Sequence, residues 1–570
     1  MKAARLHAPQ QDAAVLIEPS PADWPRCLRT NAQRFQKSGG VFCGVALADW
    51  RREMQGLVRC LATQQLARWG LQADWPDTGF LVTGHQPELF HPGVWAKHFA
   101  VGEAAASMGL VPLNLIGDQD QPKRLAIRVP TRTSQGLGAC WVPFYDASPL
   151  LAWEEYELAT PENGAKPTVL PEGEHILESQ AAKGLTNVGS VDVLGLPDFA
   201  QRVTAECGEL LPEMILPRFW TLAMQLASRL HPPLGLAELL AGARRTWEQR
   251  WDYYNAEVRV SALCDTEPFL AFVATILGQL PDFVQHHNAE LHAYRRENRV
   301  RSRSHPVPPL QMADGWYEAP FWVWTRGQPR QRLWWCGESH RWQLRLGEVD
   351  TCMTIPAMRR REDLLDLRQS LASAGWKIRP RALTLTLFAR LFLAEMFVHG
   401  IGGGIYDRFT DRLMSRIWGI EPPQYAVVTA TLRLPLPLPS PPSCNRVEVL
   451  HRLRDCRFNP DRVLSTELLA LPEVQALVQR KRELLWHWSQ ANRQQRAILH
   501  RELAEVREAL WPLVRNTETA LRQALAELES HQAQRAVALD REWAFVLHAD
   551  TALTRLVERI RREFATRCRV

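Results

Sequence analysis

Residues 83–93 place two histidines, a glutamine and a glutamate in one short segment, directly after an apolar run. Gly84 permits a sharp turn there, which lets the backbone approach a ligand closely. His85 and Gln86 supply hydrogen-bond donors and acceptors. Because ligands of open α/β sheets bind beyond the carboxyl ends of the strands, this segment is a candidate binding loop. A loop whose polar side chains satisfy one another is the alternative interpretation.

A helix expected over residues 92–108 follows this loop, with Pro92 in its first turn. The N-terminus of such a helix favours an anion, for example a carboxylate or a phosphate. His91 and His98 are seven residues apart, so a helix would bring them to roughly one side. We therefore expect His85 to move a proton and the following residues to contact substrate: Thr83, Gly84, Gln86, His91 and His98.

Two aspartates follow the next apolar run, residues 111–116, which we expect to be a strand of the same sheet. Asp118 and Asp120 would then face the same crevice and could hold an amine or a divalent cation. They could equally cap the next turn, which is a common role of aspartate. The sequence assigns no metal ligands, since its cysteines form no zinc-binding pattern.

A third candidate is the glycine cluster at residues 398–407. Successive backbone N–H groups in such a loop can hold an anion, although a flexible turn has the same composition. His399 is a candidate acid or base, because histidine exchanges protons near neutral pH. The cluster matches neither the P-loop nor the dinucleotide fingerprint, so no NAD or Walker-type site is expected. The expected substrate contacts here are Gly400, Gly402, Gly403, Tyr406 and Asp407.

These segments need a sheet to position them, and the order strand, helix, strand over residues 79–116 is typical of a parallel α/β sheet. The core resumes near residue 380 with a second apolar run. The expected divisions are an N-terminal helical segment (1–75), the first part of the core (76–150), an inserted connecting region (151–379), the second part of the core (380–434), a proline-rich linker (435–464), an antiparallel helical hairpin (465–550) and a C-terminal helix (551–570).

The predicted hairpin depends on heptad-like spacing. Leu499, Leu503, Val506 and Leu510 follow one helix face, and Pro512 is expected to stop or kink that helix. A second helix is then expected after Asn516, which would cap it. Two amphipathic helices with a short break favour an antiparallel hairpin, a unit that often mediates dimerisation.

Composition narrows the class of protein. The 570-residue chain has a formal net charge of +6 and mixes both signs of charge along most of its length. The locally basic stretch 295–303 is most simply a solvated helix face, so we expect no nucleic-acid partner. Eleven cysteines at irregular spacing imply reduced thiols in the cytoplasm. No apolar run of about 18 residues occurs, so no membrane association is expected.

The candidate loops resemble motifs of the bacillithiol biosynthesis cysteine-adding ligase family. That family has Thr-Gly-Gln-Gln-x-x-Leu-Phe after its first core strand, and an acidic segment after the next strand that matches residues 118–120. Its late loop, Gly-Pro-Gly-Glu-x-x-Tyr, aligns with residues 400–406. The matching residues are Thr83, Gly84, Gln86, Leu89, Phe90, Gly400, Gly402 and Tyr406, whereas His85 and Gly403 replace a glutamine and a glutamate.

The resemblance implies a Rossmann-like core with connecting insertions and a coiled-coil domain through which the chain forms a homodimer. It also implies amide-bond formation between cysteine and the amine of a sugar malate, or between similar substrates. Amide formation from a free carboxylate is uphill in water, and ATP is the obvious source of activation. Two other hypotheses are a nucleotidyltransferase on the same core and a non-catalytic scaffold that acts through its helical hairpin.

Overall fold

The computed structural model describes residues 6–72, 74–145, 150–159, 190–192, 196–229, 235–302, 307–348, 351–442 and 444–565. The chain forms two compact units. Unit 1 comprises Met1–Val129, Cys140–Leu434 and Arg541–Val570, and unit 2 comprises Pro130–Ala139 and Pro435–Asp540. The last residue of the basic stretch 295–303 lies outside the described residues.

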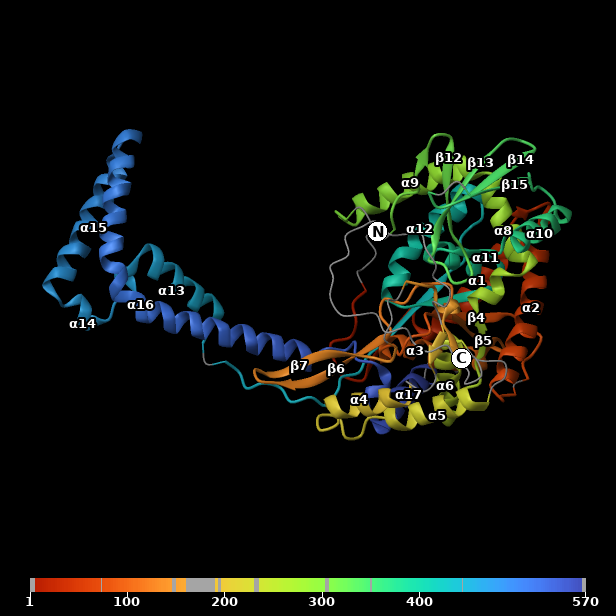
Figure 1. Ribbon diagram of the computed structural model, residues 1–570, viewed down its shortest axis with the longest axis horizontal. Helices are drawn as coiled ribbons and strands as arrows, with labels where there is room; N and C mark the ends of the chain where they lie inside the picture. The colour runs from red at the N-terminus through yellow and green to blue at the C-terminus, as the bar shows by residue number, and fades with distance from the viewer. Residues whose placement is uncertain are drawn as a thin grey trace. The chain divides into compact units, whose positions relative to one another are not determined.

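Unit 1 is built on a six-stranded sheet with the order β1-β18-β17-β4-β5-β10. Neighbouring strands are parallel, except that β1 runs antiparallel to β18. The predicted α/β class with a mainly parallel core sheet is therefore confirmed (Figure 1). The strands are β1 (Ala14–Glu18), β4 (Phe80–His85), β5 (Val111–Ile116), β10 (Ala256–Arg259), β17 (Ala394–His399) and β18 (Tyr425–Thr431).

The connections on either side of the sheet's centre define where a ligand can bind. Helix α3 (Pro92–Met108) carries the chain from β4 to β5, and α12 (Ile401–Trp418) carries it from β17 to β18. Because β4 and β17 are neighbours, these two connections leave in opposite directions. Crossovers share one hand, so they pass over opposite faces of the sheet (Figure 1). A crevice therefore opens where the two strands end.

Further helices cover the sheet and extend unit 1. The central strands are almost wholly apolar because both of their faces are covered, as in β4, where Phe80, Leu81 and Val82 are all fully buried. The other long helices of unit 1 are α1 (Trp24–Lys37), α2 (Leu47–Arg68), α4 (Pro197–Cys207), α5 (Leu216–Arg229), α6 (Leu236–Glu248), α8 (Glu267–Leu277), α9 (Leu280–Glu297), α10 (Leu364–Ala374), α11 (Ala382–Phe392) and α17 (Asp550–Ala565).

A second, antiparallel sheet lies within the region predicted to be inserted. It contains β14 (Arg341–Leu346), where alternating Trp342, Leu344 and Leu346 are buried. The other strands are β11 (Met312–Ala313), β12 (Trp316–Thr325), β13 (Gln331–Gly337), β15 (Cys352–Pro356) and β16 (Trp376–Pro380).

Two predicted segments are wrong in part. The segment 1–75 is not only helical, because β1 joins the edge of the core sheet. The region 151–379 is not only an insertion, because it supplies β10, which pairs with β5. That strand is four residues long and contains fully buried Glu257, which is paired with Arg244, so it lacks the apolar pattern of a core strand.

Unit 2 is mainly helical. Helix α15 (Pro472–Gln490) turns back into α16 (Arg493–Ala538), and Arg480 forms an ion pair with Glu502 at 2.6 Å. Helix α13 (Arg446–Phe458) also packs on α16, with Val449 and Cys456 buried in the same apolar cluster. The segment 435–464 is therefore not only a linker, as predicted, since it contains α13. The short helix α14 (Thr466–Leu469) completes this group.

The expected stop at Pro512 is wrong, because α16 continues through it as one helix. The alternative, a kink, agrees with the bend of α16 in Figure 1. Leu510 and Val514, on either side of the proline, are fully buried and hold the helix to its neighbours. Asn516 consequently lies inside α16 and caps nothing. The segment after residue 540 belongs to unit 1 and not to the hairpin.

Across the described ranges, none of the helices is long and apolar enough to cross a lipid bilayer.

Candidate functional site

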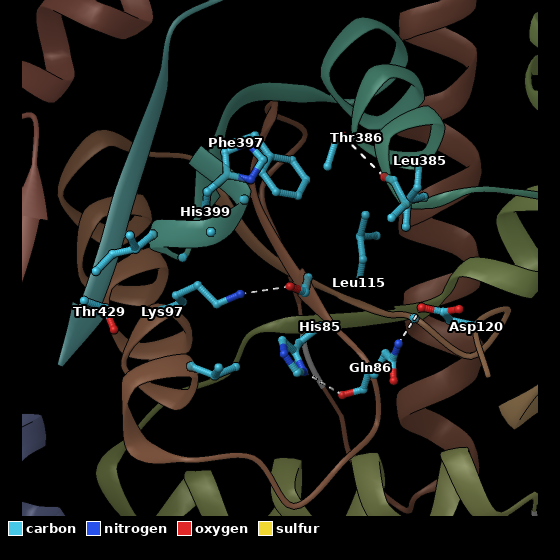
Figure 2. Close-up of a pocket in the computed structure, with 18 of the residues that line it drawn as sticks. His85, Gln86, Lys97, Leu115, Asp120, Leu385, Thr386, Phe397, His399 and Thr429 are labelled. Carbon is cyan, nitrogen blue, oxygen red and sulfur yellow. Dashed lines mark hydrogen bonds between the residues drawn. The ribbon is translucent and has the colours of Figure 1, made fainter. Parts of the chain in front are cut away.

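A cavity of about 400 Å³ lies at the carboxyl ends of β4, β5 and β17. The early loop and the late glycine cluster, some 300 residues apart in sequence, line it together (Figure 2). Its wall includes the following predicted residues: Gly84, His85, Gln86, His91, Asp120, His399, Gly400, Gly402 and Gly403. Leu115, Val260, Leu385 and Phe397 give the cavity an apolar side.

Sheet register explains why the two histidines meet. His85 is the last residue of β4, and His399 is the last residue of β17. These strands are parallel neighbours, with Phe397 opposite Val82. Both side chains therefore reach the same edge of the sheet, where the chain turns away from its strands.

His399 is oriented by a buried carboxylate. Its Nε2 atom lies 2.9 Å from Asp407 Oδ2, and Asp407 also pairs with Arg390 at 2.5 Å. Burial raises the pKa of the Asp407 carboxyl, but Arg390 and His399 outweigh burial and hold that pKa well below its ordinary value. Because an ionised carboxylate only accepts hydrogen bonds, the proton of neutral His399 resides on Nε2. Nδ1 is then the basic nitrogen.

The first turn of α12 keeps that nitrogen uncovered. A β-carbon at Gly403 would lie 2.9 Å from His399 Nδ1, whereas one at Gly400 would meet nothing within 4 Å. Gly400, Gly402 and Gly403 thus expose backbone to the cavity at the positive end of an 18-residue helix. The arrangement can hold an anionic oxygen beside a histidine base.

His85 has different properties. Burial, with Lys97 nearby, lowers the pKa of His85 to about 3, so its imidazole is neutral at physiological pH. Its Nδ1 atom lies 3.1 Å from the carbonyl oxygen of Gln86, and its ring packs edge-on against Phe90. It can therefore exchange hydrogen bonds with a ligand, but it carries no positive charge.

The first turn of α3 forms another part of the wall. His91 caps the helix by accepting a hydrogen bond from the backbone N–H of Gly93 at 3.0 Å. A β-carbon at Gly93 would lie 2.8 Å from Thr429 Oγ1, so only glycine fits between α3 and the end of β18. Two helix N-termini, those of α3 and α12, consequently face one cavity.

Sequence reasoning missed the two cations of the cavity, Lys97 and Arg541. Lys97 is 4% exposed, and its ammonium donates to the carbonyl oxygen of Gly84 at 2.9 Å. Burial lowers its pKa to about 8. The sequence contained an indication of this role, because Lys97 is the one lysine in a helix of mostly small and apolar residues. Arg541 had no such signal, since a distant segment brings it to the site.

The opposite side of the cavity presents acceptors. Asp120 forms an ion pair with Arg330, from the β12–β13 turn, and accepts a hydrogen bond from Gln86. Gln119, which sequence reasoning also missed, is 4% exposed, and its Oε1 atom has no hydrogen-bond partner within the described part of the chain. A buried acceptor without a donor favours a ligand that carries N–H or O–H groups.

Five residues predicted to contact substrate or take part in catalysis do not line the cavity. Asp118 instead caps α7 (Val260–Cys264), accepting from the backbone N–H and hydroxyl of Ser261 at 2.9 and 2.5 Å. Burial and the nearby Glu154 raise the pKa of Asp118 to about 6. Asp118 is thus neither a cavity residue nor a cap of the turn that follows it, because its hydrogen bonds go to a helix 143 residues away in sequence.

The other four have structural contacts. The Thr83 hydroxyl donates to the carbonyl oxygen of Val398 at 2.8 Å and ties β4 to β17. His98 is buried against Glu248, with Nδ1 and Oε1 2.9 Å apart. The ring of Tyr406 packs edge-on against that of Tyr294. Asp407 also lies behind the wall, where it orients His399.

Within the described residues, no group of three or more histidine, cysteine, aspartate or glutamate side chains could hold a metal ion. The cavity's donors, an ammonium, a guanidinium and two helix N-termini, fit the phosphates of ATP. Comparison of the sequence with protein-family models and with curated proteins gives no match.

Proposed function

We propose that the chain is a ligase that forms an amide bond between an amine and the carboxyl group of an anionic small molecule. The observation that carries the proposal is one cavity that combines an oriented histidine base, two helix N-termini and a buried acceptor with no partner among the described residues. The resemblance to the bacillithiol cysteine-adding ligases suggests cysteine and a sugar malate as the substrates.

Each part of the cavity has a role in this reaction. The amine donates hydrogen bonds to Gln119 Oε1, beside Asp120. His399 Nδ1 accepts the proton that the amine must lose as it attacks the acyl carbon. Backbone N–H groups at the start of α12 stabilise the negative charge that develops on the acyl oxygen. ATP, when bound, would supply the activation that a free carboxylate lacks.

The same proposal includes a homodimer in the cytoplasm, joined through α15 and α16 acting as a coiled coil. The support is the apolar surface of these helices, where Leu485, Trp486 and Ile498 are about half exposed or more. Light scattering after size-exclusion chromatography would report the mass in solution.

The test is product formation. Purified protein is incubated with cysteine and glucosaminyl malate, with and without ATP, and the amide is measured by mass spectrometry. His399→Ala is expected to reduce the rate about 10²–10⁴-fold, the usual contribution of a positioned acid or base. His340→Ala is the matched control, because His340 is exposed and is not part of the cavity wall.

Absence of the amide under every condition would reject the proposed reaction. Release of pyrophosphate with a phosphorylated acceptor would favour the nucleotidyltransferase hypothesis instead. Equal rates for His399→Ala and His340→Ala would remove His399 from the mechanism.

A further inference from the structure

Lys97 is a buried cation that has no carboxylate partner among the described residues. Its one hydrogen bond, to the carbonyl oxygen of Gly84, uses one of the three N–H groups of an ammonium. Burying a charge without a counter-ion costs free energy, so most buried lysines are paired. Since Lys97 lines the cavity, an anionic ligand is the partner that would complete its environment.

A second cation lies in the same wall. Arg541 Nη1 donates to the carbonyl oxygen of Ala430 at 2.9 Å and lies 3.4 Å from Thr429 Oγ1. Thr429 lies beside Gly93 in the first turn of α3. Lys97 follows Gly93 by about one helical turn. Figure 2 shows Lys97 and Thr429 on one side of the pocket and Asp120 on the other.

We propose that Lys97, Arg541 and the first turn of α3 bind the phosphoryl group of an activated acyl substrate. The inference rests on the proposed function and names its activated substrate class. A phosphoryl group offers up to two negative charges and three oxygens, which match two cations and a helix N-terminus.

The phosphoryl group is the leaving group of the reaction. The amine nitrogen attacks the acyl carbon, so a C–N bond forms and the C–O bond to phosphate breaks. The electron pair of that C–O bond goes to the phosphate oxygen, where Lys97 and Arg541 stabilise the charge. The proton lost by the amine goes to His399 Nδ1. An acyl phosphate and an amine thus give an amide, inorganic phosphate and a proton.

The test measures binding and needs no turnover. The full chain is titrated calorimetrically with inorganic phosphate, with ATP and with malonate at constant ionic strength. Phosphate is expected to bind at least tenfold more tightly than malonate. Lys97→Met and Arg541→Gln are each expected to weaken phosphate binding at least tenfold. Arg326→Gln, which changes an exposed arginine outside the cavity by the same charge, should bind as the unaltered chain does.

The titrations can also contradict the phosphoryl subsite. Unchanged phosphate affinity in Lys97→Met, or malonate binding as tight as phosphate, would overturn it. Tighter binding of ATP than of phosphate identifies a nucleotide as the phosphoryl source, and equal binding identifies an acyl phosphate. Lys97→Arg retains the charge and should bind phosphate within a few-fold of the unaltered chain, which separates charge from folding. Phosphate binding by a chain that forms no amide would reject the proposed reaction and leave this subsite standing.

Discussion

At the scale of residues, the site depends on which atoms remain uncovered. Asp407 accepts a hydrogen bond from Nε2 of His399. Because Gly403 has no side chain, Nδ1 of His399 remains open to the cavity. The glutamate that the resembling family has at this position would cover the nitrogen. Glycine at residue 403 and histidine at residue 399 are therefore complementary, and this pairing distinguishes the chain from the family pattern.

Gly403→Ala tests this pairing. Its β-carbon would lie 2.9 Å from His399 Nδ1, so the rate of amide formation is expected to fall about 10²-fold or more. Alanine is about 1 kcal/mol better than glycine inside a helix, so the fold should persist. Gly56→Ala in α2 is the control, since nothing lies within 4 Å of its β-carbon. Retained activity in Gly403→Ala would show that Nδ1 is not the base.

Lys97 predicts a pH dependence of stability. Its pKa falls from an ordinary 10.5 to about 8 because of burial, so the folded state binds fewer protons than the unfolded state between these pH values. The free energy of unfolding should therefore rise as pH increases from about 8 to 10.5. At pH 7 the buried charge costs on the order of 3 kcal/mol.

Lys97→Met should remove both effects. The variant is expected to be more stable than the unaltered chain at pH 7, and its advantage should shrink as pH approaches 10.5. Urea denaturation at several pH values measures this difference. Parallel stability curves for the two proteins would contradict the account of Lys97 as an uncompensated charge.

At the scale of elements, α16 shows how packing overrides a local signal. Pro512 lacks the N–H that would bond to the preceding turn, yet the helix extends over 46 residues. Buried Leu510 and Val514 keep the flanking turns in place. The cost of the proline is thus offset by the apolar contacts of unit 2.

Pro512→Ala should stabilise unit 2, because Pro512 is exposed and alanine restores the missing hydrogen bond. A proline inside a helix costs about 3 kcal/mol relative to alanine, which sets the upper limit of the gain. The thermal transition of the helices, followed by circular dichroism, should move to higher temperature. An unchanged or lower transition would mean that the helix is shaped around its proline.

At the scale of the whole molecule, the chain leaves unit 1 and returns to it twice. The last return brings Arg541 to the cavity and α17 to the outer surface of α3. Five apolar side chains of α17 are essentially fully buried: Leu553, Leu556, Val557, Ile560 and Phe564. The C-terminal segment is therefore part of the core that supports the site.

Truncation after residue 540 should abolish folding of unit 1. Burial of each large apolar side chain contributes about 1.5–3 kcal/mol, so losing five approaches the roughly 5–15 kcal/mol that stabilises a typical domain. Soluble yield and circular dichroism of the truncated chain measure the effect. Truncation after residue 565 retains α17 and should fold normally. A soluble, folded chain ending at residue 540 would contradict this assignment.

The sequence by itself determined the order strand, helix, strand over residues 79–116 and the two loops that line the cavity. Apolar runs that end at Gly84 and Gly400 are local patterns, and parallel strands place the following residues at one edge of the sheet. It also indicated His85, Gln86, Asp120 and His399 as residues of one cleft. These inferences succeeded because they depend on neighbours in the chain.

Only the tertiary structure decided what each side chain does. Asp407 orients His399, Asp118 caps a helix, His98 pairs with Glu248, and Lys97 has no carboxylate partner in the described chain. Local sequence gives all four the same polar character. Long-range packing likewise adds β10 to the sheet and brings Arg541 to the cavity. Pairing and burial depend on residues hundreds of positions away. The charge, tautomer and accessibility of the site side chains are therefore set by the tertiary structure and not by local sequence.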